Sequence, residues 1–146
     1  MLVKVEVDPN LNETEVLVRC KNVDEEIMEL VQKLNITNKT IVAGFSKDKL
    51  QVLNTSNIIR FYTENQKVYA QTNEDKYLIR LRLYELEERL NNKMFVRISN
   101  SEIVNLNFIK NIDLSFVGTL CLELKNGENA FASRRYVSKI KEVLGI

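Results

Sequence analysis

The chain has 146 residues, of which 45% are hydrophobic and 28% are charged, and its formal net charge is +1. With no histidine, two cysteines and four scattered glycines, it offers no Ser–His or Cys–His pair, no cysteine-built zinc site and no glycine-rich phosphate loop. We therefore expect a globular protein of one domain with a small extension, and no enzyme, small-molecule substrate, cofactor or bound metal.

The N-terminus predicts two short strands. Apolar and polar side chains alternate in residues 2–7 and 15–20, and Asp8 and Pro9 between them favour a turn. The apolar block of a signal peptide is missing, and no stretch reaches the roughly 18 apolar residues of a membrane span. We therefore expect a cytoplasmic protein, in which Cys20 and Cys121 are buried free thiols rather than a disulfide.

A helix is predicted after Asp24, whose carboxylate can cap it. Its apolar side chains recur at helical spacing and form one stripe of Ile27, Leu30, Val31 and Leu34. Two more strands are predicted at 39–45 and 49–53, followed by a polar joint at 54–57. Residues 1–56 carry seven Lys+Arg and nine Asp+Glu, a net charge of −2. We interpret them as a small β-β-α extension and as a candidate dimerisation or partner unit.

The next stretch predicts a three-stranded antiparallel meander over residues 58–64, 67–72 and 76–81. A short helix over 82–90 follows, with its apolar face formed by Leu83, Leu86 and Leu90. The adjacent Glu87 and Glu88 fit a solvated helix face better than an acid/base pair.

Residues 94–105 contain a strand, a polar knuckle at Ser99, Asn100 and Ser101, and a second apolar run. Serine and asparagine are common in ordinary β-turns. The same side chains, held between buried β-branched residues, would also suit phosphate oxygens and base edges. The knuckle alone leaves both interpretations open.

Further strands are predicted over residues 110–116, 118–125 and 128–133, followed by a final helix that Ser133 can cap and that ends before Gly145. Arg134 and Arg135 begin this helix, where the helix dipole disfavours cations. They are either two solvated surface arginines or residues that meet an anionic partner. Residues 91–146 carry eight Lys+Arg and five Asp+Glu, a net of +3, the sign expected if this end meets phosphate.

Four segments, in this order, resemble the LytTR family of DNA-binding domains. They are the helix from Leu83 to Leu90, the run with Phe95, Arg97, Ile98, Ser101, Val104 and Asn105, the Leu-Lys-Asn-Gly turn at 124–127 and the Ser-Arg-Arg-Tyr-Val run at 133–137. The resemblance extends over residues 58–144, and the whole chain is similar to stand-alone members without a receiver domain. It implies an α+β, mostly antiparallel, multi-sheet β fold with short helices, which reads the major groove of DNA through loops.

The resemblance also implies three DNA-contacting tips. They carry Gln66 and Lys67 at a hairpin turn, Asn100 and Ser101 at the knuckle, and Ser133, Arg134 and Arg135 at the strand-to-helix corner. By its chemistry Arg135 suits guanine, and Gln66 and Asn100 suit adenine. The other four side chains suit phosphate contacts.

The expected function is that of a cytoplasmic, bacterial-type transcriptional regulator that binds double-stranded DNA sequence-specifically through a LytTR domain at residues 57–146. The alternative is a non-catalytic interaction module on the same fold, acting through residues 1–56. Both are compatible with a homodimer, and the resemblance to stand-alone members adds a membrane or regulatory protein as a further partner.

Overall fold

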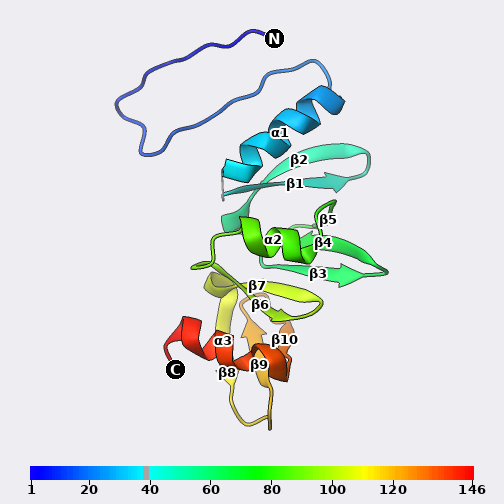
Figure 1. The fold of residues 1–146 in the computed structure, drawn as a ribbon, viewed down its shortest axis with the longest axis vertical. Coiled ribbons are helices and arrows are strands. Elements are labelled where there is room, and N and C mark those ends of the chain that lie inside the picture. The colour runs from blue at the N-terminus through cyan, green and yellow to red at the C-terminus, as the bar shows by residue number, and fades with distance from the viewer. Residues whose placement is uncertain (38–39) are drawn as a thin grey trace.

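The computed structural model describes residues 1–37 and 40–146 (Figure 1). The helices in this part of the chain are α1 (Glu25–Thr37), α2 (Leu83–Arg89) and α3 (Arg134–Leu144). The strands are β1 (Ile41–Ser46), β2 (Lys49–Asn54), β3 (Arg60–Glu64), β4 (Lys67–Gln71), β5 (Lys76–Ile79), β6 (Phe95–Ser99), β7 (Glu102–Asn105), β8 (Ile109–Asp113), β9 (Leu120–Leu124) and β10 (Asn129–Ala132). The molecule is elongated, with α1 near one end and α3 near the other (Figure 1).

The predicted α+β, mostly antiparallel β fold is confirmed. Strands arise where apolar residues alternate, as in β3 and β4, and the helix ends follow local signals. The Asp24 carboxylate accepts a hydrogen bond from the backbone N–H of Ile27 at 3.0 Å, and Gly145 ends α3 in the left-handed conformation with a φ of 74°. The strand predicted over 39–45 begins at a residue outside those described, and β1 follows at Ile41.

Two antiparallel sheets build the fold. The larger has seven strands in the order β2-β1-β5-β4-β3-β7-β6, and the smaller has three in the order β10-β9-β8. The predicted meander is present, because β3 pairs with β4 and β4 pairs with β5. The pairing of β3 with β7 then brings the meander beside the knuckle between β6 and β7.

Strands β6 and β7 are buried on both faces and separate two hydrophobic cores. Phe95 and Ile103 point into the first core, together with the predicted apolar face of α2. Val96 and Val104 point into the second core, where the small sheet and Ile140 of α3 complete the packing. Removing a fully buried leucine such as Leu86 by substitution to alanine would cost roughly 2–5 kcal/mol. Because β6 and β7 pack against a hydrophobic core on each face, the loop that joins them is held from two sides.

The prediction of strands at residues 2–7 and 15–20 is wrong. Both segments are extended but unpaired, and form an arm beyond α1 (Figure 1). The turn between them does form, with Leu11 N–H donating to the Asp8 carbonyl at 3.3 Å. Alternation of apolar and polar side chains is not enough to form strands, because an isolated pair of strands is only marginally stable in water without a further layer to cover it. The β-β-α extension is thus an extended arm followed by α1.

A further expectation, the burial of Cys20, is wrong. Cys20 is exposed rather than buried, whereas Cys121 is buried, and both are free thiols. The sheet also continues across the expected boundary at residue 56, because Phe45 of β1 pairs with Leu78 of β5. The polar joint at 54–57 is a short 3-10 turn inside the fold. Within the described residues, no helix has the length and apolar character needed to cross a membrane.

Candidate nucleic-acid interface

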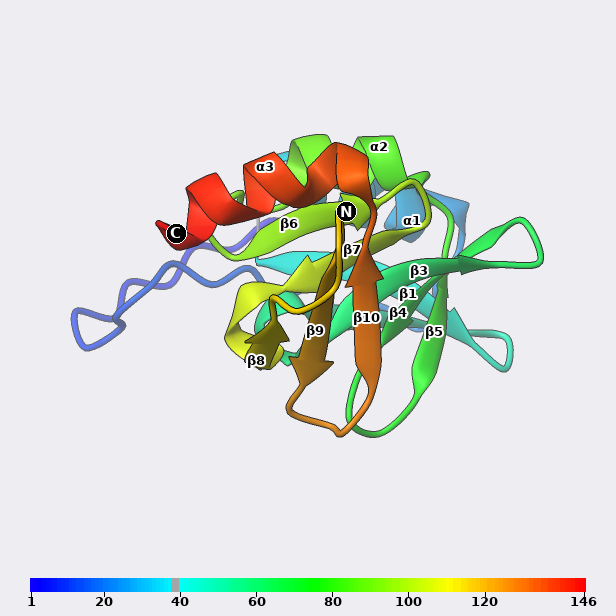
Figure 2. The same cartoon turned by 90° about the horizontal axis from the view of Figure 1, so that it is seen from below.

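Three exposed tips lie on one side of the molecule: the β3–β4 turn, the β6–β7 turn and the corner between β10 and α3 (Figures 1 and 2). Backbone hydrogen bonds set their spacing. The N–H of Thr63 donates to the carbonyl of Ser101 at 3.0 Å and joins the first tip to the second. The N–H of Ser133 donates to the carbonyl of Ile98 at 2.9 Å and joins the third tip to the second. Segments far apart in sequence thus form one continuous strip.

The first tip is a tight hairpin turn formed by Asn65 and Gln66. Both residues have positive φ, 51° and 65°, as a two-residue turn of type I′ requires. The turn is closed by the pairing of Glu64 with Lys67. Gln66 and Lys67 are exposed, and behind them the rings of Tyr62 and Tyr69 stack with centroids 5.9 Å apart. The turn therefore presents an amide and an ammonium group on a stiff base.

The second tip is the knuckle, and Arg97 holds its backbone. The guanidinium of Arg97 donates from Nε to the Ser99 carbonyl at 2.7 Å and from Nη2 to the Asn100 carbonyl at 2.8 Å. Its Nη1 pairs with Glu87 at 3.3 Å. Asn100 and Ser101 are exposed at the tip itself. The predicted pair is thus presented by a turn whose carbonyls are already bonded.

Glu102 directly follows the knuckle, but its carboxylate is turned into the protein. It pairs with Arg60 at 3.0 Å, and Arg60 also contacts Glu128, which directly precedes β10 of the small sheet, at 2.6 Å. Burial raises the pKa of Glu102, while the attraction of Arg60 acts in the opposite direction. Arg60 therefore links the large sheet to the small one through Glu128, and the Glu102 carboxylate that it pairs with does not occupy the exposed strip.

The third tip combines two arginines with a helix N-terminus. Arg134 and Arg135 are exposed in the first turn of α3. Ser133 occupies the N-cap position as predicted, but the expected side-chain cap is wrong, since its hydroxyl makes no capping hydrogen bond. Gly118, with a φ of 73°, leaves room for the Arg134 side chain, because a Cβ there would lie 2.7 Å from its Nε. The corner suits an anion, which free N–H groups and cations both attract.

All seven predicted residues are exposed on these three tips. Two residues that sequence reasoning did not assign to the site are Arg97 and Tyr136. Arg97 grips the knuckle backbone, and the Tyr136 hydroxyl donates to Asn100 Oδ1 at 3.1 Å. Arg97 carried a usable signal, because a cation between the apolar residues of a buried strand needs a partner. Tyr136 carried none, since its contact spans 36 residues of sequence.

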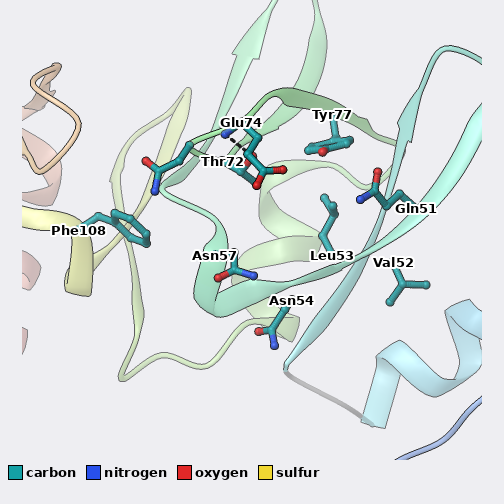
Figure 3. Close-up of a pocket in the computed structure, with 10 residues that line it drawn as sticks. Gln51, Val52, Leu53, Asn54, Asn57, Thr72, Glu74, Tyr77 and Phe108 are labelled. Carbon is teal, nitrogen blue, oxygen red and sulfur yellow. Dashed lines mark hydrogen bonds between the residues drawn. The ribbon is translucent and has the colours of Figure 1, made fainter.

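A polar hollow of about 280 Å³ lies elsewhere, beside β2 and the β4–β5 turn (Figure 3). Its lining is dominated by amides and hydroxyls and includes Asn54, Asn57, Thr72 and Glu74. None of the predicted DNA-contacting residues lines it. The exposed strip, and not this hollow, is the candidate site.

Comparison with known proteins gives a consistent result. The family model described as LytTr DNA-binding domain matches residues 48–145. Two Staphylococcus aureus proteins, each described as an uncharacterized HTH-type transcriptional regulator, align with 99% of this chain and 100% of their own length. The protein of strain NCTC 8325 is 33% identical and that of strain MRSA252 is 32% identical. The solved structure of a LytTr DNA-binding domain from Bacillus cereus has a TM-score of 0.72 and 28% identity, covering 75% of this chain and 100% of that chain.

The relatives' description names a helix-turn-helix type, whereas the described part of this chain contains no two helices in succession. Strands separate α1 from α2 and α2 from α3. The inner face of α3 is occupied as well, because Ile140 is fully buried against the second core. The exposed strip is therefore made by loops and one helix N-terminus.

Proposed function

The chain belongs to the LytTR family of DNA-binding domains, and we propose that this transcriptional regulator reads the major groove of DNA through its three exposed tips. DNA binding and regulation of transcription follow from the family and from relatives that match over their whole length. The observation that carries the proposed reading mode is the strip itself. Its polar and cationic side chains are exposed on hydrogen-bonded loops, and the neighbouring Glu102 is already paired.

The chemistry of each tip suggests its role. Arg135 can donate two hydrogen bonds to guanine, and Gln66 and Asn100 can read a base edge with their amides. Lys67 and Arg134 supply positive charge for phosphates, and the hydroxyls of Ser101 and Ser133 supply hydrogen bonds. A groove about 12 Å wide admits a two-stranded β-ribbon as well as a helix, and two of the three tips are the turns of antiparallel strand pairs.

Binding of the purified protein to random duplexes at two salt concentrations tests this proposal. Arg135→Ala should lose enrichment at one or more positions of the selected motif, at a cost of about 1–3 kcal/mol for the best sequence. Arg134→Ala is the matched control: it removes the same charge one residue away, and should weaken all sequences alike. The proposal fails if no duplex binds at low salt and micromolar protein, or if the two variants behave identically.

We also propose that residues 1–23 mediate self-association. Apolar side chains are exposed along the arm at 67–90% of their surface; they are Leu2, Val3, Val5, Val7, Val16 and Leu17. Apart from the turn at Asp8, the described arm before the helix cap forms no backbone hydrogen bonds, so its extended segments are open to pairing. A standard interface uses roughly 20–30 residues on each side, which the arm nearly supplies. A dimer would then present two strips to repeated half-sites.

Sedimentation of the full chain and of a form lacking residues 1–23 tests the arm. The full chain should sediment as a dimer and the shortened form as a monomer that still binds a single half-site. Val5→Lys with Val16→Lys is a second variant that keeps the length of the chain. If the full chain stays monomeric at roughly 100 μM, any dimer is too weak for regulation. That result would overturn the proposed self-association and favour a membrane or regulatory protein as the partner. In either role we propose a non-catalytic protein that acts in the cytoplasm, where bacterial DNA lies.

A further inference from the structure

We infer that Tyr136 is a positioning residue: its hydroxyl fixes the Asn100 amide and thereby sets base preference at the position that Asn100 reads. This inference rests on the proposed reading mode. It concerns a residue outside the seven that were predicted to touch DNA.

The Tyr136 hydroxyl orients the amide of Asn100. Asn100 lies on an exposed turn, where an asparagine side chain would ordinarily rotate among several rotamers. Here its Oδ1 accepts a hydrogen bond from the Tyr136 hydroxyl at 3.1 Å. The Nδ2 group of Asn100 has no partner among the described residues. The side chain is thus held by its acceptor and keeps both donors available.

The group that remains available on Asn100 is a hydrogen-bond donor. In the major groove, donors are matched by purine N7, guanine O6 and thymine O4. An amide held by its oxygen favours bases with such acceptors, above all a purine. An amide free to turn would offer its donors and its acceptor in either arrangement, and would discriminate less.

Tyr136 is itself held in place by its neighbours. Tyr136 is half-buried in the first turn of α3. The guanidinium of Arg97 lies 6.0 Å from its ring centroid and that of Arg135 lies 5.9 Å away. Arg97 also grips the Asn100 carbonyl at 2.8 Å. The Tyr136 ring therefore lies beside Arg97, which holds the second tip, and beside Arg135 of the third tip. Its hydroxyl fixes the Asn100 amide between the two tips.

Tyr136→Phe is the informative variant, because it keeps the ring and both cation contacts and removes only the hydroxyl. In a selection from random duplexes, the position flattened by Asn100→Ala identifies where Asn100 reads. We expect Tyr136→Phe to reduce preference at that same position and to weaken binding of the best sequence several-fold. The positions that depend on Gln66, the affinity for random duplex and the salt dependence should not change.

A double-mutant cycle separates positioning from general damage. Once Asn100 is alanine, Tyr136→Phe should have no further effect on the selected motif. The side-chain amide signals of Asn100 in the NMR spectrum of the free protein should also move in Tyr136→Phe, and Ser138→Ala, an exposed neighbour on α3, should leave them in place.

The outcomes distinguish the two proposals. If the native protein enriches no motif, the proposed reading mode fails. If the native protein enriches a motif and Tyr136→Phe enriches the same one with the same affinity, only the role of Tyr136 is overturned. Unchanged Asn100 amide signals in Tyr136→Phe would overturn it as well.

Discussion

Glu102 shows how one residue beside the strip responds to its surroundings. It is the residue next to the knuckle, and its Oε1 pairs with Arg60 while its buried Oε2 has no hydrogen-bond partner in the described part of the chain. Burial raises the pKa of Glu102, and the nearby charge of Glu128 acts in the same direction. The folded protein therefore binds this proton more tightly than the unfolded chain does.

A pH-dependent effect on stability follows. The contribution of Glu102 is fully present below the ordinary glutamate pKa, and is lost as pH rises through the raised pKa of the folded state. Glu102→Gln stays neutral at every pH. Its melting temperature should exceed that of the native protein at pH 7, and the difference should shrink as the pH falls through the acid range. Glu64→Gln, on an exposed pair with Lys76, is the control and should change little. A melting difference that grows toward acid pH would contradict this account.

Two hairpin turns contain residues whose backbone conformation lowers stability, and in one of them the residue type is explained by the proposed function. In the β3–β4 turn Asn65 and Gln66 have positive φ, and so do Lys47 and Asp48 in the β1–β2 turn. Glutamine seldom adopts this conformation, since its Cβ crowds the backbone there. Its place at the tip is best explained by its amide, the group proposed to read a base.

Gln66→Gly should therefore separate stability from binding. We expect the free energy of unfolding to rise by about 0.5–1 kcal/mol, because glycine adopts positive φ without strain, and specific DNA binding to weaken. Asp48→Gly is the matched control in the other hairpin: it should give a smaller gain, because aspartate tolerates positive φ better than glutamine does, and leave binding unchanged. Denaturant unfolding and duplex titration measure the two quantities. Loss of binding in both variants would mean that the β1–β2 turn also contacts DNA.

At the scale of the whole molecule, the packing of the two sheets places three tips on one side (Figure 2). Strand β7 carries the knuckle beside β3, and α3 starts beside β6 through the bond between Ser133 and Ile98. A single duplex lying along this side would meet all three tips. The charges on different tips should then act on the same bound DNA.

Salt dependence tests that arrangement. Lys67→Ala in the first tip and Arg134→Ala in the third should each lower the slope of log affinity against log salt by about 0.9, the release expected for one phosphate. The double variant should lower it by about 1.8, because the contacts are separate. Lys49→Ala, on the exposed edge of β2, is the control. If either tip alone accounts for the whole change, the duplex does not span the strip.

Local chemistry allowed most elements to be predicted from the sequence. Alternation located the strands of the meander, helical spacing located α2 through Leu83 and Leu86, and Asp24 and Gly145 marked helix ends. These signals are readable because each depends on residues a few positions apart. The resemblance to LytTR domains added the seven residues of the three tips; all seven are exposed, and their contacts with DNA stay a prediction.

Tertiary structure alone decided what depends on distant partners. Residues 2–7 alternate as regularly as β4 does, yet they form no strand, because a strand needs a paired neighbour and a covered face. Contacts between residues far apart in sequence leave no local pattern either. Two examples are the ion pair of Arg60 with Glu102, 42 residues apart, and the hydrogen bond of Tyr136 with Asn100, 36 residues apart. Periodicity records which side of an element is buried; which element lies against that side is set only when the whole chain packs.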